Sequence, residues 1–250
     1  MSIVLPSAGP DLTFNLPPVT NSINIADQSI SIPTSGAVSQ TSAEDGHNFF
    51  ILKLIADLSG LQSEITGLLC SQLNRSPRCG ERIEIQQATL APLIPASLVV
   101  AHLHFERWFC PPGQGWESPS ELAAGDGTIE IKLTPSVETN VGLRLVSEVG
   151  RVDGDGFLRE LLSSGALGAE LREQITASLL SALQRGTDLK NALPPAALGF
   201  ATIQKAEFQD ASAGRLSLVL DGQLQFSDEQ KKQFTAQLKQ RLSAQEASPP

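Results

Sequence analysis

Two segments of this chain repeat each other, and the repeat limits the folds that the chain can adopt. Residues 61–73 (LQSEITGLLCSQL) align without a gap with residues 171–183 (LREQITASLLSAL), and six of the thirteen positions are identical. The offset of about 110 residues is longer than the repeat unit of a solenoid and predicts an internal duplication into two similar halves. Shorter matches follow in the same order: residues 85–90 with 203–208, and residues 103–105 with 224–226.

Each half is expected to combine a long helix with a hairpin. Apolar residues recur at three- and four-residue steps over residues 48–74 and 157–183, which is typical of amphipathic helices. Residues 97–109 and 216–226 instead alternate between apolar and polar side chains, as half-buried strands do. A one-sided helix and a one-sided hairpin each have an apolar face to bury, so we expect them to pack together. The predicted fold class is therefore α+β, with two similar modules that each pack a long amphipathic helix on an antiparallel twisted sheet.

The repeat and the loops between its parts predict a division of the chain. Prolines in the first residues forbid a long helix there, and Asp228 is predicted to cap a last helix. The predicted segments are an extended Pro-rich arm with a strand (1–46), a first helix-plus-hairpin module (47–110), a linker loop (111–127), a second strand-helix-hairpin module with a C-terminal helix (128–242) and a tail (243–250).

Composition argues against several classes of function. The formal net charge is −9, whereas a general nucleic-acid binder needs a basic face to neutralise phosphates. Tyr is absent and Trp occurs twice, so aromatic platforms for bases or sugars are few. No apolar run has the roughly 18 residues of a membrane span. The first residues lack the basic segment of a secretory signal, which favours a cytoplasmic location.

Three cysteines leave the redox state open. Cys70, Cys79 and Cys110 can be three free thiols, or one disulfide with one free thiol. A local bridge between Cys70 and Cys79 is feasible across the intervening residues. Free thiols are favoured because no secretory signal points to an oxidising compartment.

No catalytic or metal-binding motif stands out. His102, His104 and Glu106 share one face of a strand with Cys110, a spacing that can ligate a metal. No fourth convincing ligand is near in sequence, so a polar strand face beside solvent is favoured. Asp153 and Asp155 begin a pattern that resembles a calcium loop, but the later ligand positions do not fit. The chain lacks the signatures of nucleophilic catalysis and of phosphate binding. We therefore expect a protein that is not an enzyme and needs no cofactor.

The helix segments 61–73 and 171–183, with the long strands 99–105 and 216–226, resemble the tubular lipid-binding (TULIP) group, which includes the BPI-like and SMP proteins. The likeness covers residues 48–242 and lies in the arrangement of elements. It implies a twisted sheet wrapped on a long helix, with an apolar groove for lipid chains.

Two functions follow as hypotheses. The first is a non-catalytic binding protein for lipid or another apolar ligand, in which Gly222 leaves space for the ligand and apolar stripes line a cavity; the same stripes could instead pack as a solid core. The second is a structural or assembly protein that contacts protein partners through residues 1–46. The predicted ligand-binding residues are Leu61, Ile65, Val99, Leu103, Phe105, Leu218, Leu220, Leu224 and Phe226.

Overall fold

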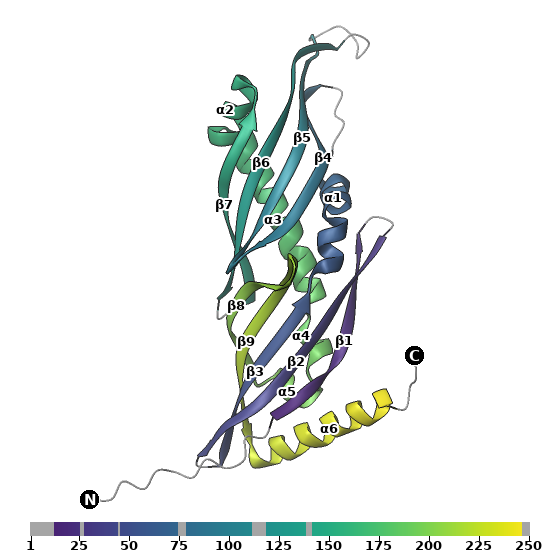
Figure 1. Cartoon of the computed structure of the whole chain (residues 1–250), viewed down its shortest axis with the longest axis vertical. Coiled ribbons are helices and arrows are strands. Elements are labelled where there is room, and N and C mark those ends of the chain that lie inside the picture. Colours follow the sequence, from purple (N-terminus) through teal and green to yellow (C-terminus); the bar gives the residue numbers. More distant parts are fainter. Residues whose placement is uncertain are drawn as a thin grey trace, which may run out of the picture.

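Two antiparallel sheets follow one another along the long axis of the molecule (Figure 1). The computed structural model describes residues 13–25, 28–44, 46–74, 79–111, 119–138 and 142–246. The five-stranded sheet has the order β1 (Thr13–Ile25), β2 (Gln28–Glu44), β3 (His47–Asp57), β9 (Arg215–Ser227) and β8 (Ala201–Ser212). The four-stranded sheet has the order β4 (Gly80–Leu93), β5 (Ala96–Phe109), β6 (Ser120–Glu138) and β7 (Gly142–Gly154).

Two helices cover one side of both sheets. The first, α1 (Ser59–Leu73), contacts β4 and β2, and the longer α3 (Ala166–Gly186) contacts β7 and β1. The remaining helices are α2 (Gly156–Ser164), α4 (Leu189–Ala192), α5 (Pro195–Leu198) and α6 (Asp228–Glu246), the last of which crosses the lower end in Figure 1. No helix in the described part of the chain is both long and apolar enough to cross a membrane.

The predicted fold class, two modules that each pack a long helix on their own sheet, is wrong. The molecule is mostly sheet, and each sheet takes strands from both halves of the chain. The hairpin β8–β9 joins β1–β3 because β9 pairs with β3, and the hairpin β4–β5 joins β6–β7 because β5 pairs with β6. Alternation along a strand shows which face is buried, but it does not show which strand becomes the neighbour.

The segments that repeat in the sequence occupy corresponding places in the two sheets. The order β2-β3-β9-β8 in one sheet matches the order β7-β6-β5-β4 in the other, and β1 is the additional strand. Residues 61–73 form most of α1, and residues 171–183 lie within α3. The path of the chain differs between the two sheets, because β3, which lies beside β9, leads into α1, whereas the edge strand β7 leads into α2. The duplication stays a prediction.

Two stretches adopt a different structure from the predicted one. Residues 48–57, predicted as the start of a long helix, belong to strand β3, in which Phe50, Leu52 and Leu54 alternate inward. The spacing of Leu54, Leu58 and Leu61 is compatible with one continuous helix and also with a strand followed by a helix. The strand forms because β3 pairs with β2 on one side and with β9 on the other. Strand β6 begins at Ser120, inside the segment predicted as a linker. Residues 13–25 and 28–44 of the predicted arm form β1 and β2.

The last helix begins with a different cap from the predicted one. Ser227 and Gln230 form a reciprocal capping box, in which the backbone N–H of Ser227 donates to Gln230 Oε1 and the backbone N–H of Gln230 donates to Ser227 Oγ. Asp228 instead accepts a hydrogen bond from the Asn48 side chain. The capping signal therefore begins one residue earlier than predicted.

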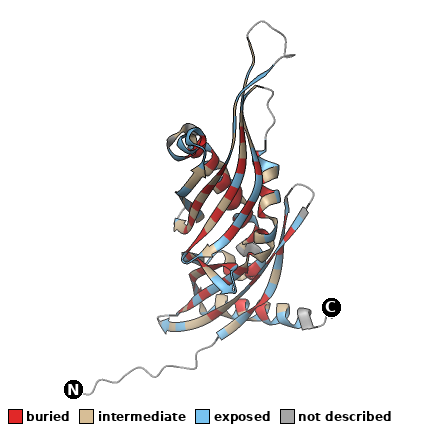
Figure 2. Ribbon diagram, turned by 45° about the horizontal axis from the view of Figure 1, so that its top comes forward, coloured by how far each residue is buried: buried red, intermediate tan, exposed pale blue. Residues whose placement is uncertain are grey.

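One apolar core runs through the molecule (Figure 2). On β5, Val99, Ala101, Leu103 and Phe105 are buried, which confirms the predicted inward face of this strand. At the lower end the core is aromatic: the Phe226 ring lies 5.1 Å from the Phe234 ring and 5.6 Å from the Phe50 ring. Helix packing and sheet packing thus share a single interior.

A disulfide between Cys79 and Cys110 joins the start of β4 to the end of β5. The feasible local pair of Cys70 and Cys79 is therefore not the one that forms. Cys70 is free and donates its thiol hydrogen to the Ile85 carbonyl oxygen at 3.0 Å, and burial raises the pKa of this thiol. The favoured expectation of three free thiols is wrong, because hairpin pairing brings together two cysteines that are 31 residues apart. Structural disulfides are rare in reducing compartments, so this bond weighs against the cytoplasmic expectation.

Candidate functional site at the junction of the sheets

The two sheets meet at a waist, which we define as the region where α1, the β4–β5 turn and the β8–β9 turn come together. Gln62 of α1 joins the sheets there: its Nε2 donates to the carbonyl oxygens of Leu90 and Gly214, and its Oε1 accepts from the backbone N–H of Leu216. The backbone N–H of Phe208 donates to the Pro95 carbonyl oxygen at 2.9 Å. The described strands of the two sheets do not pair with each other, so these bonds and apolar packing hold the waist.

A cavity of about 10 Å³ lies inside the waist. We call it the waist cavity. Its walls come from both sheets and from both long helices, and all are apolar except for one serine. The lining residues are Leu58, Leu61, Leu90, Ser97, Leu133, Leu145, Leu179, Leu183, Phe208 and Leu216.

Ser97 is the polar exception among these walls. Its side chain is fully buried, and its Oγ has no hydrogen-bond partner in the described part of the chain. A buried hydroxyl without a partner costs about 1–3 kcal/mol of desolvation. Native proteins keep few such groups, and each one calls for an explanation. Ser97 therefore marks the waist cavity as a place where a hydrogen-bonding group of a ligand would be stabilised.

The predicted ligand-binding residues are all buried in the core. Leu61 and Ile65 lie on α1, three others lie on the inner face of β5, and the remaining four lie on the inner face of β9. Only Leu61 lines the waist cavity. Gly222 leaves no space for a ligand, because a Cβ built there would lie 2.6 Å from the Thr202 carbonyl oxygen. The residues thus belong to one interior but do not surround a single pocket.

The waist residues that sequence analysis missed come from segments far apart in the chain. Leu133, Leu179 and Phe208 lie on three different elements and meet only in the tertiary structure. Ser97 could have been found, because it has the same parity as Val99, Ala101 and Leu103. A polar residue at a core-facing position of an alternating strand is a signal for a functional or strained site.

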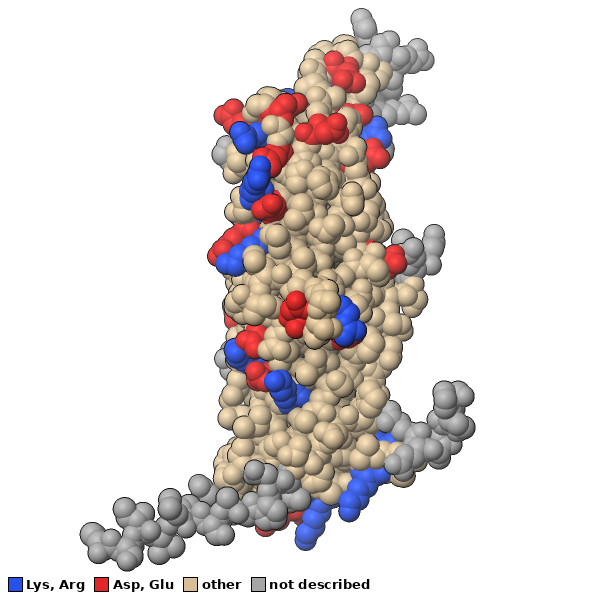
Figure 3. All heavy atoms as spheres, viewed as in Figure 1, with Lys and Arg blue, Asp and Glu red and all other residues tan. Residues whose placement is uncertain are grey.

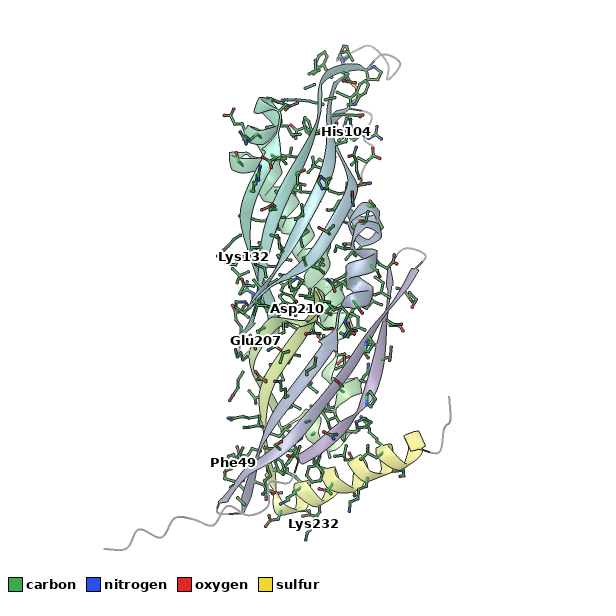
Figure 4. All side chains as sticks on the ribbon, in the orientation of Figure 1. Phe49, His104, Lys132, Glu207, Asp210 and Lys232 are labelled. Atoms are coloured by element: carbon green, nitrogen blue, oxygen red, sulfur yellow. A yellow bond between two sulfur atoms is a disulfide. The ribbon has the colours of Figure 1, made fainter. Side chains whose placement is uncertain are left out.

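A polar cluster lies on the outer face of the four-stranded sheet, around His104 near the upper end in Figure 4. His104 Nδ1 is 2.8 Å from Asp126 Oδ1, and its Nε2 is 3.4 Å from Glu106 Oε1. Arg82 and Trp108 also donate to Glu106. Within the described residues no group of His, Cys, Asp and Glu side chains is arranged to hold a metal. The cluster is therefore an ion-pair network that joins β4, β5 and β6.

We expect the contribution of this cluster to stability to fall as the pH rises. The hydrogen bond to Asp126, with the charges of Asp126 and Glu106, raises the pKa of His104 above its ordinary 6.5. The contribution is fully present below the unfolded pKa of about 6.5 and is lost as the pH rises through the higher folded pKa. Replacement by His104→Gln should cost less than about 1 kcal/mol, because exposed ion pairs are weak.

Urea unfolding between about pH 5 and about pH 9 would measure this difference between wild type and His104→Gln. The difference should be largest at the acidic end and should shrink on raising the pH. Asp126→Asn removes the charge of the principal partner of His104. This variant should therefore reduce the pH-dependent part of the free energy of unfolding that His104 contributes. A His104→Gln difference that is constant with pH would contradict the assignment.

The waist cavity is lined by nine apolar residues and one serine. Its lining residues include no general base, and the Ser97 hydroxyl has none within its walls to activate it.

Comparison with known proteins finds no matching family model, no matching curated protein and no matching solved structure. Function must therefore be inferred from the residues of this chain.

Proposed function

We propose that this protein is a non-catalytic binder of an apolar ligand, a lipid or a molecule of similar character, and that the ligand binds at the waist. The observation that carries the proposal is the buried, unpartnered Ser97 hydroxyl in an otherwise apolar cavity. Such a site suits a ligand with an apolar body and one hydrogen-bonding group, because that group would satisfy Ser97 while the leucines contact the rest.

The resemblance to the tubular lipid-binding proteins adds support to this proposal. Helices α1 and α3 place their apolar sides against the inner faces of both sheets, so the interior is continuous along an elongated molecule. A ligand with a long chain would find apolar side chains in both directions from the waist. The buried leucines on α1, α3 and β9 would be its main contacts.

Ligand entry requires the waist to open, because the waist cavity is much smaller than the roughly 300–1,000 Å³ of small-molecule sites. Few backbone bonds cross the waist, and Gln62 makes three of the side-chain bonds there. Outward movement of one sheet relative to α1 would enlarge the cavity without breaking a strand ladder. The bound ligand would then make apolar contacts with the leucines that no longer contact one another.

The Ser97→Ala variant separates the proposed role of Ser97 from a structural one. Removing an unpartnered buried hydroxyl should raise the free energy of unfolding of the ligand-free protein by about 1 kcal/mol. The same change should weaken ligand binding about tenfold, because one hydrogen bond of about 1.4 kcal/mol is lost. Urea unfolding measures the first effect, and titration with the fluorescent fatty acid parinaric acid measures the second.

Thr34→Val provides the matched control. Thr34 is also buried with an unpartnered Oγ1, but it lies on β2 and does not line the waist cavity. This change should stabilise the protein to a similar extent and leave fatty-acid affinity unchanged. Failure of the wild-type protein to bind parinaric acid, together with no lipid in organic extracts of the purified protein, would overturn the proposed function.

A further inference from the structure

A hollow lies outside the core, on the outer face of the five-stranded sheet at its lower end. It has a volume of about 680 Å³ and is formed by β3, β8, β9 and the start of α6. Strand β8 begins at Ala201, opposite Leu224, so the last residues of β9 extend beyond β8. The hollow lies at this overhang of β9, and we call it the carboxamide groove. Phe49, labelled in Figure 4, marks its β3 side.

Four glutamine side chains give the groove its chemistry. Gln204, Gln223, Gln225 and Gln230 line it, and the hydroxyls of Thr202 and Ser227 lie among them. The carboxamides of Gln204, Gln223 and Gln225 make no hydrogen bond to any residue that the structure describes. Each carboxamide offers two donor hydrogens and an acceptor oxygen. The groove therefore presents free donors and acceptors side by side.

Two phenylalanines supply apolar surface at the sides of the groove. Phe200 remains 42% exposed, although its ring packs edge-on against the buried Phe226 ring at 6.0 Å. This contact holds the Phe200 ring in place while much of the side chain stays open to solvent. Phe49 is half-buried on the opposite side, across β9. The predicted shortage of aromatic platforms thus does not apply here, because phenylalanines take the place of Tyr and Trp.

The groove carries no formal charge. No Lys, Arg, Asp or Glu is among its lining residues, and His47 is the only one with an ionisable side chain. Figure 3 shows charged side chains along one edge, at the top and middle of this face and at the lower end, and an uncharged stretch over the lower part of the molecule. A charged ligand would lose hydration in this groove without gaining an ion pair.

We propose that the carboxamide groove is a second binding site, and that it takes an uncharged oligosaccharide. Sugar hydroxyls both donate and accept, as the glutamine carboxamides do, so the two sets can pair throughout. The C–H faces of a sugar ring fit the Phe49 and Phe200 rings. The volume falls within the usual range for small-ligand sites. This site is outside the core, so it is independent of ligand binding at the waist.

Titration of the full chain with a panel of uncharged oligosaccharides tests the proposal. Maltohexaose, cellohexaose, mannohexaose and fully N-acetylated chitohexaose would be added while backbone amide NMR shifts are recorded. At least one should bind with a Kd of about 1 mM or tighter and shift amides of β3, β8 and β9 around the groove. The double variant Gln223→Ala/Gln225→Ala should weaken that binding at least about tenfold, since two hydrogen-bonding groups are removed.

Gln87→Ala is the matched control, because Gln87 is an exposed glutamine on the outer face of the other sheet. It should bind the oligosaccharide as the wild type does. Parinaric acid binding should be unchanged in the double variant, which keeps this proposal separate from the proposed function. The inference is overturned if no member of the panel binds at about 10 mM or if the shifts map outside the groove. It is also overturned if an uncharged peptide, such as hexaglycine with an acetylated N-terminus and an amidated C-terminus, binds there and the oligosaccharides do not.

Discussion

Replacement of Phe226 by alanine should unfold a large fraction of the protein under conditions in which the wild type is folded. Phe226 is fully buried and its ring contacts the rings of Phe50, Phe200 and Phe234. Removal of a buried phenylalanine ring costs about 3–5 kcal/mol, from lost transfer free energy and from the cavity left behind. That is a large share of the roughly 5–15 kcal/mol that stabilises a typical domain. Urea unfolding followed by circular dichroism measures the loss.

Two further variants make this result specific. Phe226→Leu keeps most of the apolar volume and should cost less than half as much. Phe157→Ala removes a ring that is 49% exposed on α2, and it should change the free energy of unfolding by no more than about 0.5 kcal/mol. Equal losses in Phe226→Ala and Phe157→Ala would show that the aromatic cluster does not form. Phe226 is also one of the predicted ligand-binding residues. A loss of this size in the ligand-free protein would show that its main role is core packing.

Loss of the Cys79–Cys110 disulfide is expected to be the other large effect. The bond closes a segment of 31 residues that contains the hairpin β4–β5. A crosslink of this span restricts the unfolded chain and stabilises a protein by about 2–4 kcal/mol. The double variant Cys79→Ser/Cys110→Ser should therefore unfold at lower urea concentration, and a reducing agent should have the same effect on the wild type but none on the variant.

Cys70→Ser is the control for the thiol chemistry. Cys70 is half-buried and makes one hydrogen bond to the Ile85 carbonyl oxygen, so its replacement should cost less than about 1.5 kcal/mol. Peptide mapping without reduction should recover residues 79 and 110 in one linked fragment. A fragment that links Cys70 to either partner would refute the assigned pairing.

The buried faces of the strands and helices were more predictable from the sequence than the elements that pair with them. The inward face of β5 was predicted because Val99, Leu103 and Phe105 share one parity, and the period of a strand needs no tertiary information. The helical pattern over residues 157–183 was predicted from local spacing in the same way, and these residues belong to α2 and α3. By contrast, residues 48–57 obey both periodicities, and only pairing with β2 and β9 makes them a strand.

The candidate site shows the same division. The nine predicted ligand-binding residues are part of the apolar core, since any stripe of leucines on an amphipathic element will be buried. The waist cavity could not be predicted, because its walls come from eight separate elements and from Leu58, which precedes α1. The carboxamide groove was missed because it lies where β9 extends beyond β8, and the register of this pair is set only in the folded protein.

By itself the sequence determined the alternating strands, the amphipathic helices and the repeated order of helix and hairpin, because these depend on residues that are neighbours along the chain. The tertiary structure alone decided which hairpin joined which sheet, which cysteines were linked, and where Ser97 met an apolar cavity. Those outcomes depend on strand register and on contacts between distant segments. The repeated halves therefore do not form two separate modules, since β9 completes the sheet begun by β1–β3 and β5 pairs with β6.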